Sequence, residues 1–178
     1  MHSGETSSSY ALEGMINFLI SADPRAKALR EIFVFIIVPI MNPDGVFHGT
    51  YRMDTCGHNL NRFYNSAQSH KQPSVFAVQT IVNYYSQRIV FFMDLHSHPH
   101  PNKGSFIYGN CLGDIEDQTE TQMYAKILSI ESQCFGYNWC NFSSSQMNSR
   151  DLNEILTKDG SARVQVFKIL NIPFAYTM

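Results

Sequence analysis

The residues IVFFMDLHSHPH, from Ile89 to His100, carry a clear strand signal and end in three of the chain's seven histidines. The first part, Ile89–Leu95, is apolar except for one acid. Runs of this kind are typical of strands that are buried on both faces of a sheet. Because ligands usually bind where such strands end, the stretch predicts a buried strand that leads into a functional loop.

The rest of the chain predicts strands that alternate with helices. Besides Ile89–Leu95, the segments expected to form strands are Ile32–Val38, Ser105–Tyr108, Tyr137–Ser144 and Pro173–Met178. The segments with helical spacing of apolar residues, or with helix-start signals, are Tyr10–Ile20, Pro24–Arg30, Pro73–Gln87, Ile115–Ser132 and Gly160–Leu170. A turn is expected at Asn42–Gly45 and a loop at Gly57–Tyr64. This alternation predicts an α/β fold with a mixed, mostly parallel sheet covered by helices on both faces.

The composition excludes several classes of protein. The 178 residues correspond to about one domain, and an apolar content of 44% is enough to bury a core. The net charge is −2 and the 13 basic residues are scattered, which argues against a nucleic-acid surface. The longest apolar run, Ile32–Val38, is far shorter than the ~20 residues that span a bilayer. The four cysteines form no CxxC pair, which favours reduced thiols in a cytosolic protein.

A second candidate site lies at the start of the chain, in the residues HSGE. His2 and Glu5 are three positions apart, so an imidazole and a carboxylate can reach one ion from a single turn. Catalytic zinc sites use three protein ligands plus a water, and His96 at a strand end could supply the third ligand. The HxxE spacing occurs by chance in many proteins. For the histidines that follow Leu95, a polar loop rich in imidazole therefore remains the alternative to a metal site.

Several motifs together give more support than any one of them. In chain order they are HSGE, IVPIMNPDGV, YR, NLNR, DLHSH and FIYGN. Their order and approximate spacing resemble those of the zinc metallocarboxypeptidases, and within them the cytosolic carboxypeptidases, which remove glutamates from tubulin tails. The resemblance extends over essentially the whole chain. It implies that residues 1–178 form part of a catalytic domain, without the strand that should precede His2 and without a small β-rich domain before it.

The resemblance also implies roles for individual residues. His2, Glu5 and His96 resemble the zinc ligands, and Arg52 resembles the arginine that polarises the scissile carbonyl and stabilises its oxyanion. A further pair, Asn61 and Arg62, resembles the residues that hold the substrate's terminal carboxylate. Guanidinium groups suit that role because they bind carboxylates bidentately. The alternatives are a surface charge for Arg52 and a turn residue for Asn61.

Specificity for glutamate requires a positive charge in the substrate pocket. Arg163 stands in the segment where the family's pocket-forming residues lie, and we hypothesise that it recognises an acidic side chain. An exposed helix arginine is the equally plausible alternative.

Other polar residues are expected to support the ligands or to have no part in the site. Asn59 stands where many relatives carry an aspartate that orients a ligating histidine, so the same contact is expected without the charge. For Asp94, a contact to His96 and a purely structural role are both open. His98 and His100 are expected to be solvated loop residues. No metal role is expected for His48, His58 and His70.

The general base of the family is not among these residues. In relatives it is a glutamate directly after a strand resembling FAYTM, so here it is expected to follow Met178. We therefore expect the 178-residue chain to hydrolyse peptides far more slowly than its relatives do. A tyrosine that closes on the substrate in pancreatic-type relatives also has no counterpart between Tyr137 and Tyr176.

The resemblance implies a Zn²⁺-dependent enzyme that removes C-terminal residues. The expected substrates are polyglutamylated proteins such as tubulin, in the cytoplasm, at microtubules or cilia, with no nucleic-acid or membrane partner. One alternative is a non-catalytic module that binds zinc or tubulin tails. Another is an amidohydrolase of the aspartoacylase type, against which the NPDGV and NLNR stretches argue.

Overall fold

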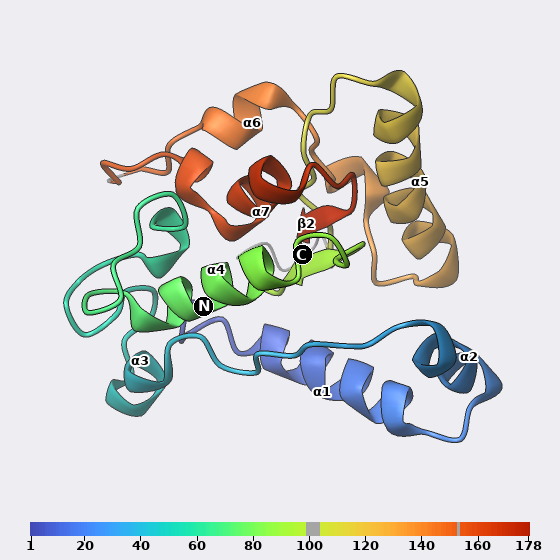
Figure 1. The fold of residues 1–178 in the computed structure, drawn as a ribbon, viewed down its shortest axis with the longest axis horizontal. Coiled ribbons are helices and arrows are strands. Elements are labelled where there is room, and N and C mark those ends of the chain that lie inside the picture. Colours follow the sequence, from blue (N-terminus) through green and yellow to red (C-terminus); the bar gives the residue numbers. More distant parts are fainter. Residues whose placement is uncertain (99–103, 153) are drawn as a thin grey trace.

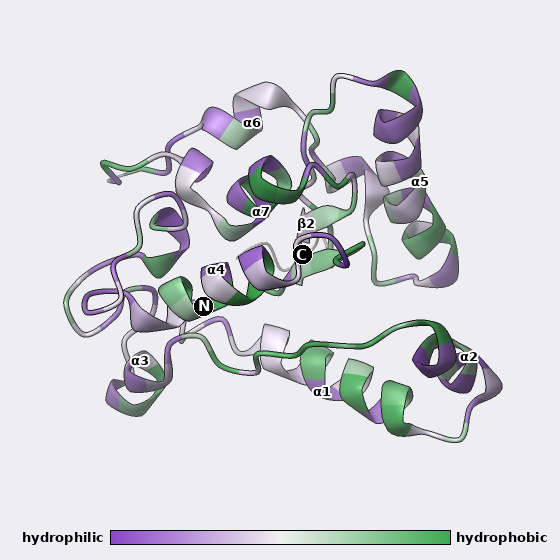
Figure 2. Ribbon diagram, viewed as in Figure 1, coloured by the Kyte–Doolittle hydropathy of each residue, from purple (hydrophilic) through white to green (hydrophobic). Residues whose placement is uncertain are grey.

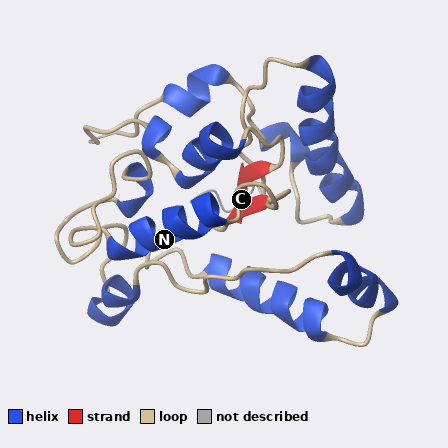
Figure 3. Cartoon of the chain, in the orientation of Figure 1, coloured by secondary structure: helices blue, strands red, loops and turns tan. Residues whose placement is uncertain are grey.

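Two short parallel strands lie at the centre of the molecule (Figure 3). The computed structural model describes residues 1–98, 104–152 and 154–178. Strand β1 (Phe92–Asp94) pairs with β2 (Ala175–Thr177) so that Phe92 lies opposite Ala175 and Asp94 opposite Thr177. Both strands lie within segments that the sequence predicts to be strands, Ile89–Leu95 and Pro173–Met178.

Single bridges extend this pair into a wider mixed arrangement. Tyr108 pairs antiparallel with Thr177 and parallel with Asn141, and Ser105 pairs parallel with Phe135. The predicted strand Ser105–Tyr108 therefore exists only as isolated bridges at its two ends.

Helices make up most of the regular structure. The α-helices are α1 (Ser7–Ile20), α2 (Pro24–Ile32), α3 (Pro43–His48), α4 (Pro73–Tyr84), α5 (Ile115–Glu131), α6 (Ser144–Asn148) and α7 (Ala162–Leu170). The 3₁₀ turns are η1 (Leu60–Arg62), η2 (Tyr137–Trp139) and η3 (Lys158–Gly160). All five predicted helices are present. Among the described residues, none of these helices has the length and apolar content needed to cross a membrane.

The helices cover both faces of the strand pair (Figure 1). Side chains alternate between the faces of a strand, so neighbouring residues of β2 enter different cores. Ala175 belongs to a core with Val75 and Val78 of α4 and Val166 of α7. Tyr176 belongs to the other core, which includes Ala125 of α5. This arrangement confirms the α/β class with helices on both faces.

The prediction of a strand at Ile32–Val38 is wrong. Ile32 belongs to α2, and the N–H of Phe33 donates to the carbonyl of Leu29 in that helix (2.8 Å). Residues 34–38 make no backbone hydrogen bond to another described residue. This segment lies along α1, where Pro39 and Ile40 line a hollow with Leu12 and Ile16. Figure 2 shows this apolar segment beside α1, away from β1 and β2. An apolar run becomes a buried strand only where neighbouring strands cover it, and here all its residues are exposed.

One further strand prediction, Tyr137–Ser144, fails for a local reason. In Tyr137–Ser144 only Asn141 pairs as a strand residue, because η2 begins the segment and α6 ends it. The Ser143 side chain accepts the N–H of Gln146 and so starts α6.

The turn predicted at Asn42–Gly45 continues as α3. The Asn42 side chain accepts the N–H of Gly45, and Pro43 occupies the first helical turn, so the turn signals serve as a helix start. Similarly, the predicted loop Gly57–Tyr64 contains η1.

Candidate metal and substrate site

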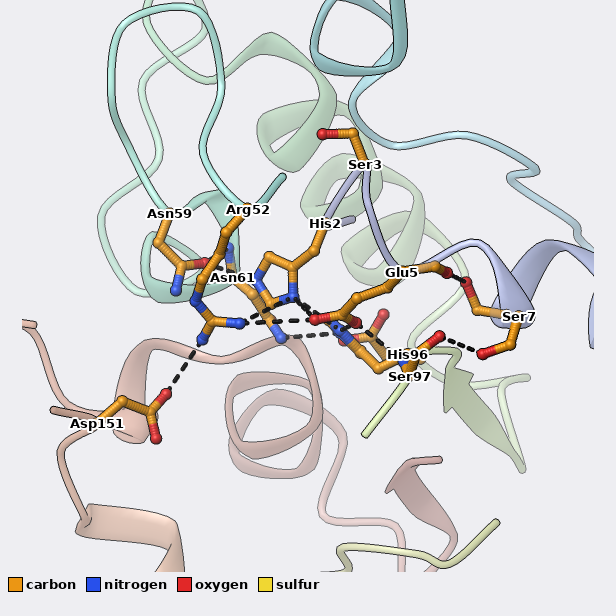
Figure 4. Close-up of polar contacts among 12 residues, drawn as sticks. His2, Ser3, Glu5, Ser7, Arg52, Asn59, Asn61, His96, Ser97 and Asp151 are labelled. Carbon is orange, nitrogen blue, oxygen red and sulfur yellow. Dashed lines mark hydrogen bonds and ion pairs between the residues drawn. The ribbon is translucent and has the colours of Figure 1, made fainter. Parts of the chain in front are cut away.

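The candidate metal ligands come from the turn before α1 and from the residues after β1 (Figure 4). The N–H of Glu5 donates to the carbonyl of His2 (3.1 Å), which holds the two residues in one turn. After β1, the N–H of His96 donates to the carbonyl of Met178 (2.6 Å). Residues 94 positions apart therefore meet at one end of the strand pair.

The ligand atoms of these residues face one another. Nδ1 of His2 lies 2.7 Å from Oε1 of Glu5, and Nδ1 of His96 lies 2.8 Å from Oε2. The two Nδ1 atoms are 3.1 Å apart. One nitrogen or oxygen from each residue lies within 4.8 Å of the others, so the set could hold a metal ion.

The outer nitrogen of each imidazole has its own partner. Nε2 of His2 lies 2.9 Å from Oδ1 of Asn59, and Nε2 of His96 lies 2.8 Å from Oδ2 of Asp94. Both partners are oxygen acceptors, so each neutral ring can donate its outer N–H and direct the lone pair of Nδ1 inward. Two such nitrogens and one carboxylate are the donors that zinc prefers, and the donor set fits this ion.

The charges within the cluster are strongly coupled. Burial would lower the pKa of His96, but Asp94 and Glu5 raise it to about 9. Burial would raise the pKa of Glu5, but hydrogen bonds from His2 and His96 hold it well below its usual value. The pKa of His2 is lowered, mainly by burial. The pKa of His96, which has a carboxylate as its outer partner, is therefore higher than that of His2, whose outer partner is a neutral amide.

An arginine pair lies beside the cluster. Nη1 of Arg52 is 3.3 Å from Nδ1 of His2 and 3.6 Å from Oε1 of Glu5. The turn that carries these ligands is tied to the arginine, because the N–H of Gly4 donates to the carbonyl of Tyr51 (2.8 Å). A Cβ atom at Gly4 would lie 2.2 Å from the Tyr51 ring, so the approach requires glycine.

The second arginine, Arg62, is buried with Asn61 in η1. Nη1 of Arg62 donates to the carbonyl of Asn61 (2.7 Å). The Asn61 side chain lies 3.0 Å from Nε2 of His96 and accepts the N–H of Ala162 (2.9 Å). Its amide therefore connects η1 to the metal cluster and to α7.

Comparison with known proteins identifies the family. The sequence profile of the family described as zinc carboxypeptidase matches residues 1–178. The chain belongs to the zinc carboxypeptidase family. This confirms the family that the motifs predict.

Curated relatives of this zinc carboxypeptidase are cytosolic carboxypeptidases. Human cytosolic carboxypeptidase-like protein 5 is 26% identical over 266 residues, which cover all of this chain and 30% of the relative. Mouse cytosolic carboxypeptidase 4 is 31% identical over all of this chain and 16% of its own length. Cytosolic carboxypeptidase 6 of Caenorhabditis elegans is 42% identical over 62% of this chain and 25% of the relative. The chain thus spans less than a third of each relative.

Solved structures support the zinc carboxypeptidase fold. The metallo-carboxypeptidase of Burkholderia cenocepacia matches with a TM-score of 0.79 and 23% identity, over 99% of this chain and 44% of that one. A metallo-carboxypeptidase of Pseudomonas aeruginosa, solved with (2-guanidinoethylmercapto)succinic acid, matches over the same shares with a TM-score of 0.71 and 23% identity. At these identities the likeness shows the fold alone.

Arg163 is buried, which argues against the exposed helix arginine that the sequence left open. Its side chain leaves α7 toward Tyr108, with the guanidinium carbon 5.9 Å from the ring centroid, and Nη2 donates to Oε1 of Gln146 (2.8 Å). Nε and Nη1 are buried and have no hydrogen-bond partner in the described part of the chain. Burial lowers the pKa of Arg163 to about 10, so the group remains charged at neutral pH.

The other histidines that the structure describes lie outside the cluster of ligand atoms. His98 stacks on the Phe106 ring with centroids 4.1 Å apart, and His58 lies 3.4 Å from Asp54. His48 and His70 are exposed, and His100 lies outside the described residues.

The sequence interpretation missed two acids of the site, Asp151 and Glu154. They lie in the loop between α6 and η3, and both contact Arg52 and Arg62. No motif marks them, because the arginines are about ninety residues earlier and only the fold brings the four groups together.

Proposed function

We propose that the chain is the core of a zinc-dependent carboxypeptidase that removes C-terminal glutamate from polyglutamylated proteins, with tubulin as the leading candidate. The observation that carries this proposal is the set of facing donor atoms from His2, Glu5 and His96 beside Arg52. We expect the enzyme in the cytoplasm, as the word cytosolic in the names of its curated relatives suggests, and propose microtubules or cilia as the place where a tubulin substrate would be met.

His2, Glu5 and His96 would hold the metal. Bound zinc supplies Lewis-acid activation of water and of the scissile carbonyl. The outer hydrogen bonds to Asn59 and Asp94 keep both imidazoles in the orientation that binding requires.

Arg52 and Arg62 would bind the charged parts of the substrate. Arg52 lies against the metal cluster, so its guanidinium can stabilise negative charge that develops on the scissile carbonyl oxygen. Arg62 lies in η1 and would pair with the terminal carboxylate. Selection for a free C-terminal carboxylate is what makes such an enzyme an exopeptidase. Asn61 would position His96 while contributing to this carboxylate site.

The general base is proposed to follow Met178. The carbonyl of Met178 accepts the N–H of His96, so the next residue of a longer chain would begin beside the cluster. A glutamate there could take a proton from the attacking water. On this proposal, residues 1–178 bind zinc and substrate but turn over peptides slowly.

The proposal is tested with the purified 178-residue chain. We expect one equivalent of zinc to bind, measured by competition with a chromogenic chelator, and a labelled peptide that ends in glutamate to bind by fluorescence anisotropy. The same peptide with an amidated C-terminus should not bind. Robust zinc-dependent release of glutamate would contradict the proposed position of the base, and equal binding of both peptides would contradict an exopeptidase site.

The glutamate preference is assigned to Arg163. Its buried, unpartnered Nε and Nη1 could pair with an acidic side chain that enters the site. Replacing it by methionine (Arg163→Met) should weaken binding of a peptide ending in glutamate by roughly tenfold or more. Binding of a peptide ending in glutamine, which has the same shape without the charge, is the control and should change little. Equal losses for the two peptides would mean that Arg163 supports the fold only.

A further inference from the structure

The arginine pair of the site is already occupied by two carboxylates of the chain itself. Nε of Arg52 donates to Oε1 of Glu154 (3.0 Å), and Nη2 donates to Oδ2 of Asp151 (3.1 Å). Nε of Arg62 lies 2.9 Å from Oε2 of Glu154, and its Nη2 donates to Asp151. Each acid therefore bridges both guanidinium groups, and together they cover the donors that a carboxylate ligand would use.

The loop that carries these acids is held by charge more than by packing. Arg150 and Thr157 pair in an antiparallel bridge and close the base of the loop. Between them, Leu152 is 94% exposed and Ile155 is 86% exposed, so the apolar side chains of the loop contribute little burial. The main described contacts at its centre are thus the ion pairs to the arginines and a hydrogen bond from Nδ2 of Asn59 to Oε1 of Glu154 (2.7 Å). Charged contacts such as these ion pairs can be exchanged for those of a ligand.

Burial makes a counter-charge for the arginine pair necessary. The Arg62 side chain is 4% exposed, and a buried guanidinium without a partner is strongly destabilising. Asp151 has an alternative partner, because Nζ of Lys158 lies 2.9 Å from its Oδ1. Burial would raise the pKa of Asp151, but the hydrogen bond from Lys158 and the charges of Lys158, Arg62 and Arg52 lower it. Asp151 is therefore ionised at neutral pH, and it can release the arginines while still paired with Lys158.

We propose that Asp151 and Glu154 are an internal competitor for the Arg52–Arg62 pair, which an incoming carboxylate must displace. The inference rests on the proposed function, because it takes this pair as the carboxylate site of the substrate. A site that is mostly filled by its own chain binds ligand with an apparent Kd raised by the reciprocal of the free fraction. A C-terminus therefore occupies the site only if it binds the two arginines tightly enough to displace Asp151 and Glu154.

The test compares the 178-residue chain with two variants, Asp151→Asn alone and Asp151→Asn combined with Glu154→Gln. Both substitutions remove charge and keep shape. The probe is succinate, a small molecule that carries two carboxylates, and the readout is thermal stabilisation as its concentration rises. The concentration for half-maximal stabilisation should fall roughly tenfold in the variants. The single variant keeps Glu154, the partner of Nε of Arg62, so it still tests the inference if the double variant folds poorly.

A matched control is Asp159→Asn. Asp159 pairs with Lys168, and it has no ion pair with either arginine among the described residues. This variant should respond to succinate as the unaltered chain does. Equal succinate responses in all four chains would overturn the inference, whatever the peptide affinities are.

Peptide binding separates this inference from the proposed function. With the peptide that ends in glutamate, Kd should also fall roughly tenfold in the variants, while the zinc affinity of Asp151→Asn stays unchanged. If succinate binds more tightly to the variants but the peptide binds to no chain, the competitor is supported and the proposed function fails. If the peptide binds all chains alike and succinate does too, the proposed function stands and the competitor is wrong.

Discussion

Asp94 and Asn59 show how one charge distinguishes two otherwise similar ligands. Each accepts the outer N–H of an imidazole, at 2.8 Å for His96 and 2.9 Å for His2. A carboxylate partner increases the basicity of a ligating histidine, and an amide does so much less. Of the two roles left open for Asp94, the structure shows the contact to His96, made by a side chain that is only 10% exposed.

Removing the charge of Asp94 should therefore weaken metal binding. In Asp94→Asn, shape is retained and the polarisation of His96 is lost, so zinc affinity should fall by about 10- to 100-fold. Competition with a chromogenic chelator measures this change. His48→Gln, which removes an exposed histidine outside the site, should leave the affinity unchanged. An unaltered affinity in Asp94→Asn would assign the residue to the fold alone.

The candidate ligands and several of their neighbours could be named from the sequence. The HxxE spacing and the histidine after an apolar strand suggest His2, Glu5 and His96, and the order of the motifs supports them. The burial of Arg163 and the contacts of Asp151 depend on which segments meet in space. Neither property is encoded within a few residues of the position, so sequence patterns could not supply them.

At the level of elements, helices were predicted better than strands. In α4 the buried residues Val75, Val78 and Val82 follow the helical period, and that period is visible in the sequence alone. A strand is stabilised by partners that are distant in the chain. The exposed segment after α2 and the single pairing at Asn141 show that apolar content does not determine whether such partners are present.

The junction of β2 with α5 should depend on one buried tyrosine. The hydroxyl of Tyr176 donates to the carbonyl of Thr121 (3.1 Å), and the Thr121 hydroxyl also donates to the carbonyl of Pro173 (3.0 Å). Tyr176→Phe removes the first bond and the contact between the Thr121 and Tyr176 hydroxyls (2.9 Å), and it should lower the free energy of unfolding by about 1 kcal/mol. Denaturant unfolding measures this loss. The control is Tyr10→Phe, which changes a residue that is 74% exposed. Equal free energies of unfolding for Tyr176→Phe and the unaltered chain would contradict the predicted role of Tyr176.

For the whole molecule, a bound metal ion should stabilise the folded chain. Two candidate ligands come from the first five residues and the third from the loop after β1, so a bound ion would join segments that lie far apart in the sequence. Binding to the folded chain only stabilises it by about 2.7 kcal/mol at a free zinc concentration one hundred times Kd. For a chain of this size the melting temperature should rise by roughly 5–10 °C.

Thermal melts with zinc and with a chelator test this prediction. His96→Ala should lose the zinc-dependent rise, because only two ligands remain. A rise of the same size in this variant would place the metal elsewhere. These melts also test the overall architecture, since stabilisation by zinc requires that the N-terminal turn and the end of β1 meet as the fold places them.

The position of residues 1–5 and Met178 beside the metal cluster has a practical consequence for experiments on the 178-residue chain. His2 is the second residue, and the carbonyl of Met178, the last residue, accepts the N–H of His96. An affinity tag fused to either end would therefore begin at the metal cluster. A run of added histidines there would offer its own imidazoles to zinc and would mimic or mask the native ligands. Purification handles for metal titrations should be free of histidine or cleaved before measurement.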